Sequence, residues 1–197
     1  MPLDVFFEMS VTAVLTVWSP GPNNILLLSS ASKFGIKKNM GFMLGIWTGS
    51  LTLMLLCGFF CNGLTTVIPQ LQNVLPYAGG LYLMYLAWQT GRRLPPSDQD
   101  ADKVMSYPMG IFLQLINVKI IIYGMTMFTA FILPNIRSSG LILPFAVYLM
   151  ILGAIGNLIW AVAGNMLRTA YTKHYQIINI IMALLLVWCA LRVMGVL

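Results

Sequence analysis

The chain has 197 residues and a net charge of +6, yet only 8% of its residues are charged and 59% are hydrophobic. A soluble domain carries about 25% charged residues, so this composition excludes a water-soluble globular protein and indicates an integral membrane protein. The basic surplus does not indicate nucleic-acid binding, because no aromatic-basic RNA-binding motif accompanies it. Lys and Arg in the connecting segments are instead expected to set membrane topology.

Six apolar stretches are long enough to span a bilayer, since a transmembrane helix needs about 20 residues. The alternation of polar and apolar residues that is typical of a membrane barrel does not occur. The sequence therefore predicts an all-α membrane protein, with six transmembrane helices in a single domain over residues 1–197. The predicted helices are residues 5–28, 40–65, 71–89, 109–133, 141–167 and 177–193.

Basic residues are concentrated in the connections that follow the first, third and fifth predicted helices. The opposite side carries only Arg137 and Arg192, while Asp4 and Glu8 precede the first apolar run. The positive-inside rule then places both termini of a multi-pass protein on the outer side of the membrane. The basic residues of the predicted cytoplasmic side are Lys33, Lys37, Lys38, Arg92, Arg93, Lys103, Arg168 and Lys173.

Three helices followed by three helices indicate a 3+3 inverted repeat, because halves with an odd number of spans insert with opposite topology. Gly41, Gly45 and Gly49 recur every four residues in the second predicted helix. This spacing allows close helix approach, either within the chain or in a homodimer. We interpret most Trp and Tyr residues as anchors at the membrane interface.

A run of proline, glycine and asparagine interrupts the first predicted helix. Pro20 and Pro22 remove backbone donors on either side of Gly21, and in a bilayer the freed groups must face protein or a wet cavity. A new half-helix that begins at Pro22 would present free N–H groups and a positive dipole end to a carboxylate. Asn23 and Asn24 add further donors and acceptors. The alternative is a structural kink without a binding role.

Lys119 is the one charge deep inside a predicted helix, and Gln114 and Asn117 precede it. It lies roughly 15 Å into the helix, where a Lys costs about 2.5–3.5 kcal/mol on insertion scales. A bound carboxylate or a cluster of carbonyls would offset this cost, and snorkelling towards the cytoplasm is the alternative.

Helix directions put Lys119 at the depth of the break around Gly21, so we predict a clamp for the carboxylate of a small substrate between the first and fourth helices. Asn23 and Asn117 are then expected to bind an ammonium or a polar side chain. Asn157, in the fifth predicted helix, either contacts this substrate or makes an interhelical hydrogen bond.

Signatures of membrane enzymes are absent. The only histidine is His174, and no zinc-protease, serine-hydrolase or Walker motif occurs. The alternating carboxylates Asp98, Asp100 and Asp102 lack the glycine and glutamate of a calcium loop. We therefore expect a protein that is not an enzyme and that needs neither cofactor nor metal.

Around both motifs the sequence resembles the lysine-exporter (LysE) superfamily, in its homoserine/threonine resistance branch. Residues 20–23 are similar to the family's proline-glycine-proline-asparagine signature, and residues 117–119 to its asparagine-proline-lysine signature, with Val118 in place of proline. The resemblance covers essentially the full length. It implies a fourth helix that is straighter than usual, because the proline is missing.

The resemblance also implies efflux of small neutral amino acids from the bacterial cytoplasm, with cysteine and O-acetylserine as the favoured cargo. Export of homoserine, threonine or basic amino acids is an alternative, and a passive channel is another.

Overall fold

The computed structural model describes residues 1–71, 75–92, 105–136, 138–194 and 196, with some side chains inside helices excepted, and all regular elements in these ranges are helical. The predicted all-α class is therefore confirmed. The elements are α1 (Leu3–Trp18), α2 (Pro22–Phe34), α3 (Ile36–Leu71), α4 (Leu75–Gly91), α5 (Tyr107–Leu115), α6 (Val118–Thr126), the π-helix η2 (Met127–Ile132), the short 3₁₀ helices η3 (Leu133–Asn135) and η4 (Ser139–Leu141), α7 (Ile142–Met166) and α8 (Arg168–Val193).

Four helical stretches of the described residues are long and apolar enough to cross a bilayer, so the chain is a multi-pass membrane protein. They are Ile36–Phe60, Val118–Asn135, Ser139–Met166 and Lys173–Leu191. The first predicted helix is divided between α1 and α2, and α4 has 17 residues. Some residues that the sequence analysis used for topology and for the calcium-loop comparison lie outside the described part of the chain. They are Arg93, Asp98, Asp100, Asp102, Lys103, Arg137 and the side chain of Arg192.

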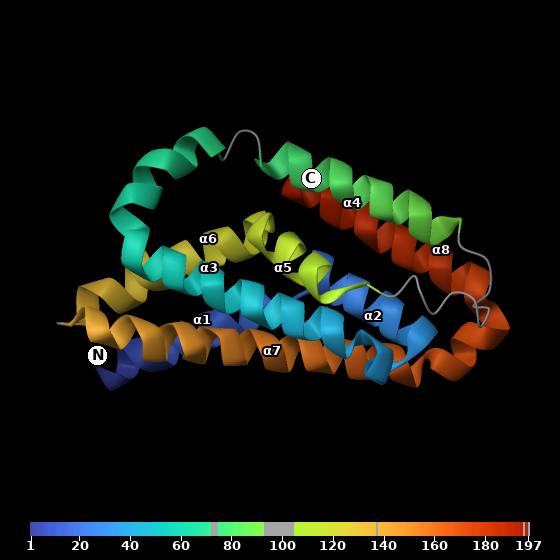
Figure 1. Ribbon diagram of the computed structural model, residues 1–197, viewed down its shortest axis with the longest axis horizontal. Helices are drawn as coiled ribbons and strands as arrows, with labels where there is room; N and C mark the ends of the chain where they lie inside the picture. The colour runs from blue at the N-terminus through green and yellow to red at the C-terminus, as the bar shows by residue number, and fades with distance from the viewer. Residues whose placement is uncertain (72–74, 93–104, 137, 195, 197) are drawn as a thin grey trace.

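The first predicted helix breaks at the proline-glycine-proline run, as expected. Ser19 (φ −62°, ψ 153°) and Gly21 (φ −165°, ψ 171°) are extended, and α2 begins at Pro22. Every residue of α2 from Asn23 to Lys33 is buried, because α3, α7 and α8 enclose this half-helix. The break therefore brings a short helix with a free N-terminus into the middle of the bundle (Figure 1).

The fourth predicted helix also breaks, and the expectation that Val118 would leave it straighter was wrong. α5 ends at Leu115 and α6 begins at Val118, with Asn117 extended between them (φ −77°, ψ 97°). The Asn117 side-chain oxygen accepts a hydrogen bond from the backbone N–H of Lys119 at 3.2 Å. An asparagine cap satisfies the first turn of a new helix, so the chain turns here without a proline.

Close backbone contacts join the half-helices to the two long helices. A Cβ atom on Gly45 of α3 would lie 2.1 Å from the Tyr107 carbonyl oxygen in α5, and one on Gly164 of α7 would lie 2.3 Å from the Leu28 carbonyl oxygen in α2. Gly49 also faces α5, while nothing lies within 4 Å of Gly41. The α3 glycine spacing therefore serves packing within the chain.

Two separate hydrophobic cores fill the bundle. The basic-end core joins α2, the start of α3, α4, α5, the end of α7 and α8, and the N-terminal-end core joins α1, the middle of α3, α6, η2 and the start of α7. Ile25, Phe42, Ala161 and Leu186 are typical of the first core, and Met9, Met54, Phe128 and Leu149 of the second. A layer of polar residues lies between them and contains Asn23, Asn24, Ser50, Gln114, Asn117, Lys119 and Asn157.

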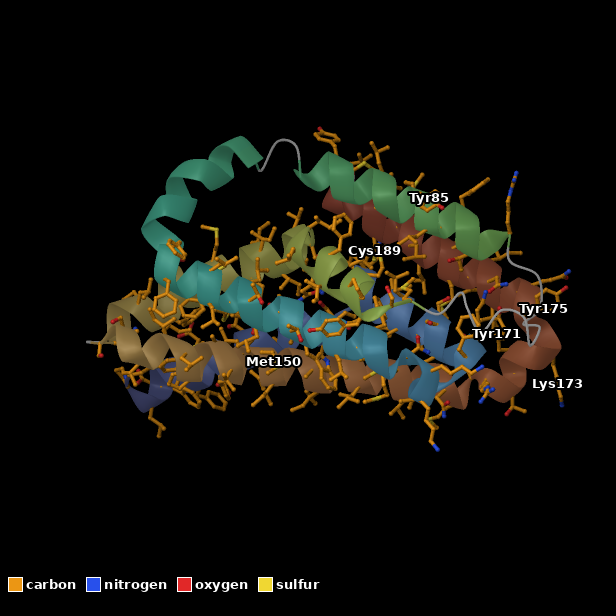
Figure 2. All side chains as sticks on the ribbon, viewed as in Figure 1. Tyr85, Met150, Tyr171, Lys173, Tyr175 and Cys189 are labelled. Carbon is orange, nitrogen blue, oxygen red and sulfur yellow. The ribbon has the colours of Figure 1, made fainter. Side chains whose placement is uncertain are left out.

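The two ends of the bundle differ in charge. α2 ends, α3 begins, α7 ends and α8 begins at the end of the molecule opposite the N-terminus (Figure 1). Figure 2 shows Lys173, Tyr171 and Tyr175 at this basic end.

Tyr171 is buried, and its hydroxyl donates to Asn179 Oδ1 at 3.0 Å. It is therefore a core residue, which is an exception to the expectation that most tyrosines are interfacial anchors.

Candidate functional site at the polar layer

The two broken helices meet at the polar layer, and each residue that the sequence singled out lies there. Two adjoining cavities occupy the layer. The central cavity has a volume of about 30 Å³, and the side cavity, of about 300 Å³, lies between the two breaks and α8. Of the candidate residues, Asn23, Asn24, Gln114, Asn117 and Asn157 line the central cavity, Pro20 lines the side cavity, and Gly21, Pro22 and Lys119 line both.

The Lys119 ammonium is held by the unwound segment between α1 and α2. Its Nζ donates to Ser19 Oγ at 2.9 Å, to the Ser19 carbonyl at 3.1 Å and to the Pro20 carbonyl at 3.5 Å. The predicted meeting of the two motifs is thus present, and oxygen atoms of the unwound segment offset the cost of the half-buried cation. A Cβ on Gly21 would lie 3.0 Å from Nζ, so only glycine lets the Lys119 side chain approach this closely.

Among the residues that the structure describes, Lys119 has no acidic partner in the layer. The carboxylate side chains within the described residues are Asp4 and Glu8, and both lie in the first half of α1, at the far end of the N-terminal-end core. A cation whose partners are neutral oxygens keeps its capacity to pair with an anion. The layer therefore offers a positive charge to a carboxylate that comes from outside the protein.

The N-terminus of α2 adds donors beside this charge. Gly21 is the N-cap of α2, and no side-chain cap is present. The N–H groups of the first turn, at Asn23 and Asn24, are consequently available, and the helix dipole favours an anion there. This half-helix and Lys119 thus place N–H donors and a positive charge at one corner of the layer, as the sequence predicts.

One chain of side-chain hydrogen bonds links α2, α5 and α3 across the layer. Asn23 Nδ2 donates to Gln114 Oε1, and Gln114 Nε2 donates to Ser50 Oγ at 2.5 Å. This chain ties α2 to α5 and α3. Because Ser50 lies one residue after the Gly49 that packs against α5, its hydroxyl is within reach of Gln114; the sequence analysis overlooked Ser50.

A second chain of amides crosses the other side of the layer. Asn157 Nδ2 donates to Asn24 Oδ1 at 2.8 Å. Asn24 Nδ2 in turn donates to the carbonyls of Val17 and Ser19, each at 3.0 Å. Asn24 therefore satisfies carbonyls that the break leaves free, and Asn157 makes the interhelical hydrogen bond that was one of its two expected roles while it also lines the cavity.

Two further residues at the site escaped the sequence analysis. Tyr123, read as one of the interfacial tyrosines, is 4% exposed and lines the central cavity. Cys189 of α8, which Figure 2 labels, lines the side cavity together with Lys119 according to the geometry of the lining residues. The signal for Tyr123 was its position four residues after Lys119, which puts both on one face of a helix. Cys189 had no local signal, because its helix reaches the site only through the tertiary fold.

A bundle of apolar helices in which two interrupted helices meet at a buried polar layer is typical of membrane transport proteins. The sequence profile of the family described as LysE type translocator matches residues 14–195. The chain belongs to the LysE type translocator family. This confirms the resemblance, and with it the expectation that the protein is a translocator and not an enzyme.

Relatives with assigned functions match over nearly the whole chain. The cysteine/O-acetylserine efflux protein of Salmonella typhimurium is 35% identical over 194 residues, which cover 98% of this chain and 97% of the relative. The protein of the same name from Salmonella typhi is 36% identical over 197 residues, with the same coverage. One from Escherichia coli is 36% identical over 180 residues, which cover 91% of this chain and 92% of the relative. No solved structure matches the chain.

Proposed function

We propose that this protein exports small neutral amino acids across the bacterial inner membrane, with cysteine and O-acetylserine as its main cargo. The observation that carries the proposal is the Lys119 ammonium, which is bound to Ser19 and Pro20 oxygens at the start of a half-helix. Within the described part of the chain it has no acidic partner. The printed names of the relatives, which are cysteine/O-acetylserine efflux proteins, support the choice of cargo.

The chemistry of the layer fits a zwitterion. A cargo carboxylate would replace the carbonyl partners of Lys119 and accept N–H groups from the first turn of α2. The released carbonyls of Ser19 and Pro20, with the amide oxygens of Asn23 and Asn117, would then bind the cargo ammonium. A layer that holds one cation and several carbonyl and amide oxygens thus has partners for both charges of a zwitterion.

The sizes of the two cavities indicate where cargo sits first. A water molecule needs at least ~10–15 Å³ of such space, so the central cavity of about 30 Å³ admits water but no amino acid. The side cavity of about 300 Å³ admits a small amino acid beside Lys119. We infer that cargo binds from the side cavity and that the central cavity widens around it during transport.

A six-helix, 3+3 inverted repeat is part of the proposal. If the halves correspond in chain order, α1 and α2 match α5 and α6, α3 matches α7, and α4 matches α8. The packing of α3 on α5 then has its counterpart in α7 on α1, that of α2 on α7 in α6 on α3, and that of α2 on α8 in α6 on α4. The contacts α3 with α7 and α4 with α8 are their own counterparts. This pairing supports a two-fold relation between the halves.

We also propose that both termini are periplasmic and that residues 1–197 form one transport domain. Lys33, Lys37, Lys38, Arg168 and Lys173 gather at the basic end of the bundle, which the positive-inside rule assigns to the cytoplasm. A homodimer stays a prediction, and Gly45 and Gly49 would not form its interface because they already face α5.

Transport into inside-out membrane vesicles tests the proposed function. Vesicles that contain the protein should accumulate labelled cysteine above the external concentration when energised, and the cargo should be recovered chemically unchanged. Vesicles from cells that lack the protein are the control. Equilibration without accumulation would identify a passive channel, and accumulation of homoserine or threonine but not cysteine would replace the cargo.

A further inference from the structure

The central cavity contains one polar atom whose role neither the fold nor the amide network explains. The Tyr123 hydroxyl is buried and has no hydrogen-bond partner, although the residue lines the cavity. A buried hydroxyl left without a partner costs about 1–3 kcal/mol, so natural proteins keep such a group where it has a use. The Trp47 indole nitrogen is also unpartnered, but Trp47 lines neither cavity.

The polar groups near Tyr123 have hydrogen-bond partners, in contrast to the Tyr123 hydroxyl. The amide nitrogens of Asn24, Gln114 and Asn157 donate to protein oxygens within the layer. Tyr148, which packs against the same hydrophobic core, has its hydroxyl 2.7 Å from Ser10 Oγ. Tyr123 therefore lines the cavity and carries a hydroxyl that no group among the described residues satisfies.

Its position relative to Lys119 indicates what would satisfy it. Residues four apart on a helix have Cβ atoms roughly 5–6 Å apart on one face, and both Lys119 and Tyr123 line the central cavity. A small amino acid that places its carboxylate at Lys119 would extend its side chain along α6 towards the phenol. The Tyr123 hydroxyl then meets the polar atom of the side chain.

We infer that Tyr123 is a specificity-determining residue, whose hydroxyl hydrogen-bonds the thiol, hydroxyl or ester oxygen of the cargo side chain. This inference rests on the proposed export function and adds the part of the site that distinguishes a polar side chain from an alkyl one. A site built to hydrogen-bond a substrate group rejects the analogue that lacks it, because the protein group is then left buried and unpaired.

Serine and 2-aminobutyrate test this directly, since they differ by a hydroxyl in place of a methyl group. Each is used as an unlabelled competitor of labelled cysteine in energised inside-out vesicles. The ratio of the inhibition constants, 2-aminobutyrate over serine, should be above one for the wild type and should fall about five- to tenfold in Tyr123→Phe. The constant for 2-aminobutyrate itself should change little.

Tyr148→Phe is the matched control. It removes a hydroxyl that is already paired, so its thermal unfolding temperature in detergent should fall while the competition ratio stays at the wild-type value. Tyr123→Phe should unfold at the wild-type temperature or above it, because it removes an unpaired group. A merely structural Tyr123 would show the reverse of this pattern.

The outcomes separate the inference from the proposed function. An unchanged ratio in a Tyr123→Phe protein that still transports cysteine would overturn the inference and leave water as the partner of the hydroxyl. A parallel weakening of both competitors would also overturn it, because shape and not hydrogen bonding would then be responsible. Absence of cysteine accumulation by the wild type would instead reject the proposed function itself.

Discussion

The two helix breaks occupy corresponding places in the two halves of the chain, yet they are made differently. Between α1 and α2, Pro20, Gly21 and Pro22 unwind the backbone, and the oxygens of Ser19 and Pro20 turn to Lys119. Between α5 and α6, the turn is shorter and Asn117 closes it with its own side chain. The first break leaves polar groups for another partner, while the second satisfies itself.

This difference divides the work at the site. The first break supplies the N–H groups of a half-helix and the oxygens that bind Lys119, and the second break delivers this cation to them with a fixed orientation. The first break should therefore be sensitive to any change that restores a continuous helix. The second should tolerate replacements that preserve the cap, whatever residue follows it.

The largest effect is expected from Lys119→Met, which removes the group that joins the two breaks. Truncation of one partner of a buried charge pair costs about 2–5 kcal/mol, so cysteine flux per inserted protein should fall by roughly 30-fold or more. Membrane insertion should be at least as efficient, because the buried ammonium disappears. Lys173→Met at the exposed basic end is the control and should transport normally. Full flux in Lys119→Met would remove this residue from the mechanism.

Replacement of Pro20, Gly21 and Pro22 together with Ala should come next. A continuous helix would take up the free N–H groups of α2 and withdraw the oxygens of Ser19. Loss of a helix N-terminus beside an anion is worth up to about 2 kcal/mol, so flux should fall about tenfold with normal insertion, measured by vesicle uptake and by quantitative immunodetection. A triple variant with normal flux would reduce this break to a kink.

A smaller effect is expected from Asn117→Ala at the other break. Loss of the N-cap of α6 should lower the free energy of unfolding by about 1 kcal/mol, read as a drop in thermal unfolding temperature in detergent, and flux should fall a few-fold as the orientation of Lys119 loosens. Asn117→Ser retains a capping oxygen and should restore most of both losses. Equal damage in the Ser variant would contradict a capping role.

The smallest effect is expected from Val118→Pro, which reintroduces the family's proline. Val118 is the first residue of α6, a position where the N–H has no intrahelical partner and where proline is favoured, and the extended Asn117 suits a following proline. Unfolding free energy should stay within about 1 kcal/mol of the wild type, on the stabilising side, and flux within twofold. A strongly destabilised variant would show that the second break depends on more than its cap.

The sequence alone predicts the first break but misses the second, because the two breaks depend on different kinds of information. Pro20 and Pro22 act through covalent geometry, whose effect on the backbone is the same in any surroundings and can therefore be predicted from the local sequence. Asn117 acts through a choice between helix and cap that depends on what surrounds it, and an asparagine inside an apolar run carries no sign of that choice. The break between α5 and α6 therefore does not require a proline at position 118.

Side chains that reach the site from elsewhere show the same limit. Lys119 is visible because a charge in an apolar run is costly wherever the fold puts it. Ser50, Tyr123 and Cys189 are common in membrane helices, and only the tertiary arrangement turns them towards the layer. α3 also continues past its predicted end at residue 65 to Leu71. It contains a kink at Phe60, which local hydropathy cannot predict.

The separation of the apolar interior into two cores has a mechanical consequence. Where the polar layer crosses the bundle, two of the helical paths have lost their continuous hydrogen-bond ladder, and two helices that continue through it, α3 and α7, carry Gly49, Gly153 and Gly156 at that level. Bending stiffness is therefore lowest in this one plane. We expect the two cores to tilt relative to each other about this plane, which is also the plane of the proposed cargo site.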